Sequence, residues 1–284
     1  MPGAASTPLS AVLGSPPTPG RVIAAFPAAV YVELTGAGEP RVIAVVTPEA
    51  ARLPNALILG RAAVPLTDVA PGQRASVGGG LVEAGPLRVR AARWWDPSPV
   101  LGVIPPAALR DGLDVCAHAA TRRASGLAGS PAVEKLGAAC AEGASARAAA
   151  LARALVGLGP GLTPSGDDVL VGLLAALRWL GQGLLDGGTP GGEEAVALAD
   201  TLAAAVAPDA DARTTPLAAT LLRCAAGGQA AGELSDVLRG LAGRSPLPPA
   251  VDGLLATGHT SGADTAWGII LGGHACLRLA GRPA

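Results

Sequence analysis

The residues best suited to chemistry lie in one stretch, Gly157 to Trp179, which reads GLGPGLTPSGDDVLVGLLAALRW. Its prolines lack an amide donor and its glycines permit left-handed backbone, so a bent loop is expected before the apolar helix. Ser165 is then expected as the helix N-cap, with Asp168 three residues later as its capping-box partner. Free backbone amides at such a helix start attract anions. The anion-binding candidates in this stretch are Gly159, Gly161, Thr163, Ser165 and Gly166.

A second stretch repeats the pattern, because GHTSGADTAWGIILG (258–272) aligns with GLTPSGDDVLVGLLA (161–175) when one gap is placed opposite Pro164. Each copy has a serine, then a carboxylate (Asp168, Asp264), then a helix glycine (Gly172, Gly268). Glycine inside a helix costs about 1 kcal/mol relative to alanine, so matched glycines predict two helices in close backbone contact. The two helix starts are therefore expected to lie side by side around one anion. The second copy adds Thr260, Ser261 and Gly262 to the anion-binding candidates.

Four side chains in the two copies are candidates for catalysis, namely Asp167, Asp168, His259 and Asp264. Asp167 lies outside the expected capping box, so its replacement is expected to reduce activity more than stability. His259 could shuttle a proton, although a lone loop histidine more often serves as a plain hydrogen-bonding group. The carboxylates could also hold Mg²⁺ through oxygen atoms, which leaves metal dependence open. Ser165 does not fit a Ser-His-Asp hydrolase, because it lies in P-S-G-D rather than G-x-S-x-G.

A third polar group, Arg213-Thr214-Thr215, precedes another helical segment. Either threonine could be a plain N-cap, with Pro216 suited to the first helical turn. Thr214 is also an anion-binding candidate. Arg213 is expected to supply the charged arm of the site, because its planar fork matches a carboxylate or phosphate.

The elements that must position these residues change character along the chain. Short strand-like runs, broken by Gly or Pro, occupy the first part, and Ala- and Leu-rich helical segments follow. Strands first and helices afterwards indicate an α+β protein, with an N-terminal antiparallel β sheet or small barrel followed by a mostly α-helical C-terminal domain. The expected organisation is a flexible leader (1–20), a strand-rich domain (21–104) and a helical domain (105–284) that carries both motifs.

Composition excludes several classes of function. The formal net charge is −1 and aromatic residues make up 2% of the chain, so neither a basic nucleic-acid surface nor a base-stacking platform is expected. Lys135 is the only lysine and lies in E-K-L, which excludes a Walker P-loop. The four cysteines form no C-x-x-C pair and are interpreted as small buried thiols. With no signal peptide or bilayer-length apolar run, a cytoplasmic protein without membrane contact is expected.

The run GLGPGLTPSGDDVLVGLLAALR, followed by RTTPLAATLLRCAAGG and GHTSGADTAWGIILG, resembles the family of small subunits of oxamate carbamoyltransferase. The resemblance covers Leu155 to Leu277 well and the strand-rich half loosely. It implies a cytoplasmic bacterial enzyme of ureide (allantoin) breakdown, with two larger partner subunits, one similar to acyl-CoA synthetases. The implied reaction moves a carbamoyl group between oxalurate and phosphate, giving oxamate and carbamoyl phosphate. A non-catalytic subunit that binds a small anion or nucleotide phosphate for regulation or assembly is the alternative.

Overall fold

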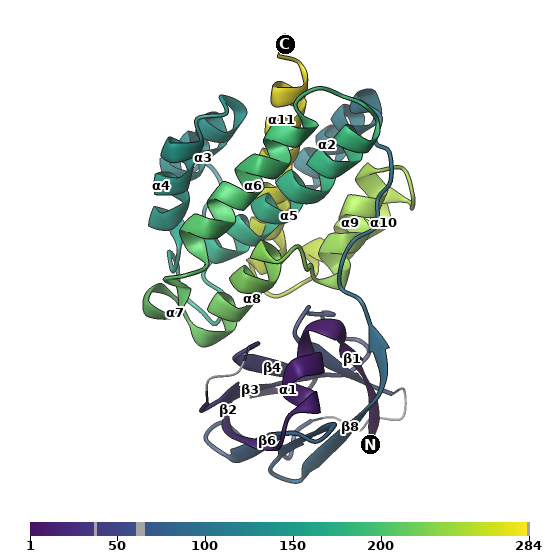
Figure 1. The fold of residues 1–284 in the computed structure, drawn as a ribbon, viewed down its shortest axis with the longest axis vertical. Helices are drawn as coiled ribbons and strands as arrows, with labels where there is room; N and C mark the ends of the chain where they lie inside the picture. The colour runs from purple at the N-terminus through teal and green to yellow at the C-terminus, as the bar shows by residue number, and fades with distance from the viewer. Residues whose placement is uncertain (37–38, 61–65, 283–284) are drawn as a thin grey trace. The chain divides into compact units, whose positions relative to one another are not determined.

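The computed structural model describes residues 1–36, 39–60 and 66–282, which form two compact units, Met1–Pro97 and Ser98–Ala284 (Figure 1). The first unit contains β1 (Pro2–Ser6), a 3₁₀ turn (Thr7–Leu9), α1 (Ser10–Gly14), β2 (Thr18–Phe26), β3 (Ala29–Leu34), β4 (Val42–Val46), β5 (Ala56–Leu59), β6 (Arg74–Gly78), β7 (Leu81–Ala84) and β8 (Leu87–Trp95). The second contains α2 (Pro106–Ala120), α3 (Pro131–Ala141), α4 (Ser145–Leu155), α5 (Ser165–Asp186), α6 (Gly192–Val206), α7 (Ala210–Arg213), α8 (Pro216–Ala226), α9 (Gly232–Leu241), α10 (Leu247–Leu255) and α11 (Ser261–Ala280).

The strands of the first unit form a closed barrel in the order β1-β5-β4-β3-β2-β6-β7-β8. The predicted α+β class with an N-terminal barrel is confirmed, although the barrel is mixed rather than antiparallel. β1 pairs in parallel with β8, and β4 pairs in parallel with β5. The second pairing is possible because residues 47–55 carry the chain back before β5 begins. Closure pairs the edge strands of the sheet, and side chains such as Val30, Ile43 and Val89 fill the interior.

The predicted flexible leader is wrong, because residues 1–20 form part of the barrel. β1 pairs with β5 on one side and β8 on the other, and β2 begins at Thr18. The sequence PGAAS offers little intrinsic strand preference, but pairing on both edges supplies its backbone with hydrogen-bond partners. Leu9 and Leu13, which follow β1, are buried in the barrel core. The amino-terminal residues therefore belong to the folded unit.

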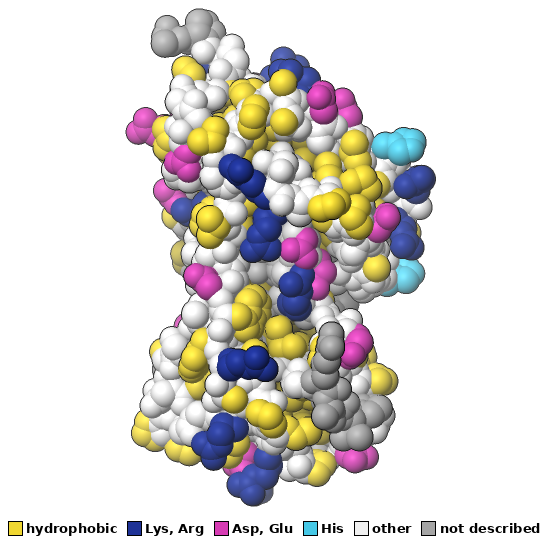
Figure 2. Space-filling model, turned by 90° about the vertical axis from the view of Figure 1, so that its right-hand side faces the viewer, with side chains coloured by type: hydrophobic (Ala, Val, Ile, Leu, Met, Phe, Trp, Pro, Cys, Tyr) yellow, Lys and Arg dark blue, Asp and Glu magenta, His cyan; other side chains and the backbone are white. Residues whose placement is uncertain are grey.

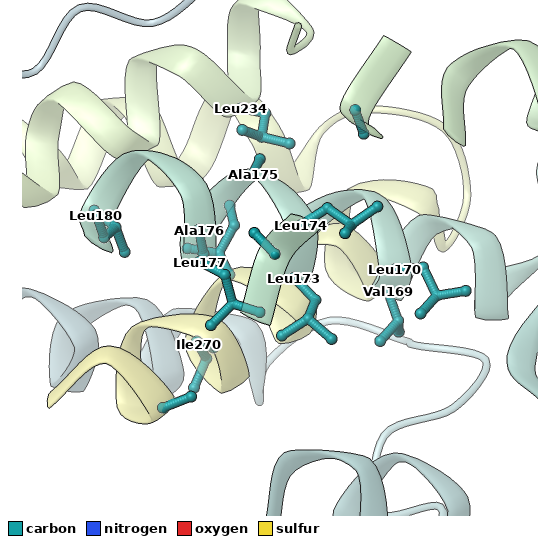
Figure 3. Close-up of a cluster of buried hydrophobic side chains, with 14 of the residues drawn as sticks. Val169, Leu170, Leu173, Leu174, Ala175, Ala176, Leu177, Leu180, Leu234 and Ile270 are labelled. Atoms are coloured by element: carbon teal, nitrogen blue, oxygen red, sulfur yellow. The ribbon is translucent and has the colours of Figure 1, made fainter. Parts of the chain in front are cut away.

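The helical unit is built around α5, which packs along α11 and α6. Its apolar side chains, from Val169 to Leu180, lie among those of neighbouring helices (Figure 3). α5 is long and apolar enough to cross a membrane by composition, but 72% of its apolar window lies buried inside the unit, as expected of a core helix. All four cysteines are buried, as predicted.

Two helix boundaries differ from those that the sequence indicates. The apolar pattern over 131–156 suggests one helix, but α3 and α4 are separate because the chain turns at Gly143, whose φ is 62°. The apolar pattern does not predict α10, because Pro248 and Pro249 suggest a loop rather than a helix. Proline is compatible with the first turn of a helix, where the amide donors are unpaired in any case.

Candidate functional site

Helices α5 and α11 cross with their backbones in contact, and two glycines make this approach possible. A Cβ added to Gly172 would lie 2.1 Å from the Thr265 carbonyl oxygen, and one added to Gly268 would lie 2.1 Å from the Val169 carbonyl oxygen. Thr265 and Val169 occupy equivalent positions in the two sequence copies. The contact is therefore reciprocal, and the helices are related by an approximate twofold axis, as the repeat predicts.

The sequence repeat also places a glycine at the start of each helix. A Cβ on Gly166 would lie 2.1 Å from the Leu155 carbonyl oxygen, and one on Gly262 would lie 2.0 Å from that of Leu254. Each glycine thus lets its helix start pack directly against the end of the preceding helix, α4 or α10. The two starts meet where Thr163 Oγ1 lies 2.9 Å from Ser261 Oγ. The expected adjacency of the starts is confirmed.

The predicted capping boxes are wrong. The N-cap positions are Pro164 and Thr260, neither side chain caps its helix, and Ser165 and Ser261 are the first helical residues. The cause is long-range competition, because the carboxylates that would complete the boxes contact other segments of the unit. Their roles are therefore set by tertiary contacts rather than by helix capping.

Asp264 is fully buried and receives donors from the chain itself. Ser125 Oγ donates to its Oδ1 at 2.5 Å, and the Gly126 amide donates to the same atom at 3.0 Å. Gly126 is wedged against the other helix too, because a Cβ there would lie 2.1 Å from Ser165 Oγ. The segment before α3 therefore packs against the start of α11 and supplies hydrogen-bond donors to the Asp264 carboxylate.

Asp168 occupies the equivalent position on α5 but has a different environment. It is 7% exposed, and its Oδ2 is buried without a hydrogen-bond partner among the described residues. Burial raises the pKa of Asp168 to about 8; the Ser261 hydroxyl opposes this shift, the Asp264 carboxylate adds to it, and Thr163 opposes it. At neutral pH the Asp168 carboxyl is therefore largely protonated, with one oxygen left over for a ligand.

Asp167 has both carboxylate oxygens engaged. Its Oδ1 accepts the Gly157 amide at 2.9 Å, and its Oδ2 accepts the Thr214 hydroxyl. Burial raises its pKa, while the hydrogen bonds from Thr214 and Gly157 lower it. Gly157 itself packs on the chain before α8, because a Cβ there would lie 2.0 Å from the Arg213 carbonyl oxygen. Asp167 therefore joins two loops, and its expected role in catalysis stays a prediction.

The loop between α4 and α5 covers the site with exposed backbone. Gly159 and Gly161 are exposed and have φ values of 116° and 102°, which glycine adopts without strain. Thr215 holds this loop, since its hydroxyl donates to the Leu162 carbonyl at 2.5 Å. Thr215 is also the N-cap of α8, accepting the Ala218 amide at 3.1 Å, so this cap prediction is confirmed.

Two predicted site residues do not join the cluster of helix starts. The Arg213 guanidinium is exposed and donates to the Arg153 carbonyl at 2.9 Å. His259 is exposed in the loop before α11, and its side chain makes no hydrogen bond to the part of the chain that the structure describes. Within the described residues, Asp, Glu, His and Cys side chains form no group of three or more that could hold a metal ion. Mg²⁺ thus stays an untested expectation.

Charge over the helical unit is mixed in sign. On the face drawn in Figure 2, Lys and Arg side chains (dark blue) alternate with Asp and Glu (magenta) over the upper part of the picture. No broad basic field is present on that face. An anion site in this unit is therefore better made by helix starts, whose amides carry the positive end of the helix dipole.

Ser125 and Gly126 are not among the site residues that the sequence predicts. A usable signal exists, because they form a third Ser-Gly pair like Ser165-Gly166 and Ser261-Gly262. It is not followed by the carboxylate or the long apolar helix that mark the other two. The contact with Asp264 spans 139 residues, which no local pattern predicts.

Comparison with known proteins agrees with the motif resemblance. No solved structure matches the chain. Residues 155–273 match the family model described as oxamate carbamoyltransferase subunit AllH. This segment contains both helix starts, the glycine crossing and the polar residues from Gly157 to Asp264. Over this stretch the chain is similar to oxamate carbamoyltransferase subunits.

Proposed function

We propose that this chain contributes part of the substrate site of an oxamate carbamoyltransferase, which moves a carbamoyl group between oxalurate and phosphate. The observation that carries the proposal is Asp168 Oδ2, a buried carboxyl oxygen without a partner between two converging helix starts. Buried polar atoms are normally hydrogen-bonded, and exceptions concentrate at functional sites. The family match over residues 155–273 supports the same assignment.

Two aspartates at an anion site require an explanation, since carboxylates repel anionic substrates. The charge on Asp264 is offset by donors from Ser125 and Gly126. Asp168 is largely neutral at pH 7, because burial raises its pKa to about 8. The two helix N-termini then contribute roughly 0.3 to 1 kcal/mol each toward binding an anion. The cluster is thereby suited to a carboxylate or phosphate despite its acidic composition.

The proposed complex includes two larger subunits, one of them similar to acyl-CoA synthetases, and functions in cytoplasmic ureide breakdown. Arg213, the cation expected in the site, donates instead to the Arg153 carbonyl. Phosphate and oxalurate together carry more charge than two helix dipoles offset. We therefore assign the remaining cationic groups to the larger subunits.

The test is an activity assay on the assembled complex, with oxamate and carbamoyl phosphate as substrates. Asp168→Asn keeps the size of the side chain but removes its exchangeable proton, and kcat/KM is expected to fall by about 10²-fold or more. The matched control is Asp252→Asn, an exposed aspartate on α10 that is expected to leave kcat/KM unchanged. Wild-type activity in the Asp168 variant would contradict a substrate site at this position.

A non-catalytic role in regulation or assembly is the second candidate, and the position of Arg213 favours it. A cluster without its own cation can hold an anion weakly without performing transfer. Comparing the larger subunits with and without this chain separates the two candidates. Full kcat from the larger subunits alone, with only KM or assembly changed by the chain, would support the regulatory role.

A further inference from the structure

The two halves of the site differ in what completes them. On α11, the Asp264 carboxylate receives the Gly126 backbone amide and the Ser125 hydroxyl. On α5, the Asp168 carboxyl has the Ser261 and Thr163 hydroxyls beside it, while Oδ2 has no partner among the described residues. Among the described residues, a backbone N–H therefore contacts Asp264 of the related pair, and Asp168 Oδ2 has no such donor.

We infer that Asp168 Oδ2 contacts the amide nitrogen of an oxamate-type substrate, as Asp264 contacts the amide nitrogen of Gly126. This inference rests on the proposed function. Because the α5 and α11 starts are related by the reciprocal Gly172 and Gly268 contacts, Asp168 and Asp264 occupy equivalent positions in the two halves. A group that suits one carboxyl therefore suits the other, and that group is a planar amide.

The opposite orientation of oxamate is unfavourable. A substrate carboxylate placed on Asp168 would lie close to the carboxylates of Asp264 and Asp167, and like charges in one site repel. Backbone amides at the helix starts, together with the exposed loop of Gly159 and Gly161, suit the carboxylate end better. The amide end is then left for Asp168.

This contact gives Asp168 a proton to exchange. The ionised form of Asp168, a minor fraction at neutral pH, is the form that reacts with oxamate and carbamoyl phosphate. The oxamate nitrogen forms the new C–N bond and loses one hydrogen, which passes to Asp168 Oδ2. The C–O bond to phosphate breaks with its electron pair on oxygen, and the departing phosphate takes up the proton. In the reverse direction phosphate attacks the carbamoyl carbon, and Asp168 returns the proton to the leaving nitrogen. A carboxyl with a pKa near 8 is suited to both directions at neutral pH.

Access to Asp168 requires a small movement. Thr163, whose hydroxyl lies beside Asp168 and Ser261, belongs to the loop between α4 and α5, where Gly159 and Gly161 are exposed. We expect a ligand to reach Oδ2 by displacing this threonine side chain, because Thr163 belongs to the loop and not to the α5–α11 contact.

The experiment compares oxamate with oxalate, which replaces the amide by a second carboxylate, using titration calorimetry on the assembled complex above pH 8, where Asp168 is ionised and can only accept hydrogen bonds. The wild type is expected to bind oxamate at least about tenfold more tightly, because a site built for an N–H group rejects an analogue that lacks it. In Asp168→Asn this preference is expected to fall about tenfold or more, since the asparagine amide can donate to oxalate. Asp252→Asn is expected to keep the wild-type preference.

The outcomes separate this inference from the proposed function. Equal binding of both anions by the wild type, or an unchanged preference in Asp168→Asn, overturns the amide contact while leaving an anion site in place. Absence of binding of either anion to the wild-type complex overturns both. Thermal unfolding of each variant serves as a check on folding, and Asp168→Asn is expected to remain folded.

Discussion

The starts of α5 and α11 share one sequence motif, but they differ in the hydrogen bonds that their carboxyl groups make. Both use a Ser-Gly pair to begin the helix and a carboxyl three residues later, and both lead into a crossing glycine. Asp264 is satisfied by Ser125 and Gly126, whereas Asp168 has an oxygen without a partner. A shared sequence motif therefore marks the scaffold, and we propose the half with the unpartnered carboxyl oxygen as the functional one.

The largest expected effect comes from breaking the crossing that relates the two halves. Gly172→Ala and Gly268→Ala each place a methyl group 2.1 Å from a backbone oxygen of the other helix. Overpacking of this kind typically costs 1–3 kcal/mol, and a clash with backbone is expected at or above about 3 kcal/mol of unfolding free energy. Denaturant unfolding of the two variants measures this cost.

Gly253→Ala on α10 is the matched control, because a Cβ there meets nothing within 4 Å. It is expected to be neutral or stabilising by up to about 1 kcal/mol, since alanine is the better helix former. A large loss for only one of the two crossing variants would disprove the approximate twofold relationship.

A second effect separates the two aspartates. Asp264→Asn removes a charged acceptor of two buried hydrogen bonds, so the free energy of unfolding is expected to fall by about 2–4 kcal/mol. For Asp168→Asn no such loss is expected, because Oδ2 has no partner among the described residues. Equal destabilisation by both substitutions would remove the distinction between the halves.

The pH dependence of stability sharpens the same comparison. The folded-state pKa of Asp168 is raised from 3.8 to about 8, so the unfolded chain loses this proton at lower pH than the native protein. Its contribution is fully present below pH 3.8 and is lost as pH rises, by about 1.4 kcal/mol per unit, until about pH 8. Asp168→Asn lacks this dependence. Thermal unfolding at a series of pH values should therefore show that the stability of the variant relative to the wild type increases as the pH rises to 8.

The smallest expected effect is that of Arg213→Lys. The Arg213 guanidinium is exposed and donates to the Arg153 carbonyl, so lysine is expected to change unfolding free energy by less than about 0.5 kcal/mol. Oxamate and phosphate affinity, measured by calorimetry on the complex, should change by less than about twofold. A tenfold loss would show that Arg213 turns into the site when a ligand binds.

The sequence predicts the scaffold of the site better than its contacts. The spacing of the motif alone predicts that Ser165 lies near Ser261 and Gly172 near Gly268. Close packing of two helices is the main physical reason for glycine at matched helix positions. The environments of Asp167 and Asp264 depend on Gly157, Thr214 and Ser125, which lie in other segments. Local rules assign such carboxylates to capping, and tertiary contacts override that assignment.

The barrel shows a similar limit. Apolar alternation indicates its central strands, but β1 has the sequence PGAAS, in which no β-branched or aromatic residue favours a strand. The conformation of β1 follows from its pairing with β5 and β8, which lie much later in the sequence. Strand preference is largely a matter of fit to neighbours, and these neighbours are not known until the barrel closes.

The backbone contact between Gly172 and Gly268 also bears on how fast the site responds to a ligand. Helices that touch through backbone atoms have no side chains to repack between them, so the two starts behave as one rigid body. Motion at the site is then confined to its loops, which rearrange in nanoseconds to microseconds, rather than to helix displacement on the microsecond-to-millisecond scale. Substrate capture at Asp168 is therefore expected to proceed without a slow conformational phase.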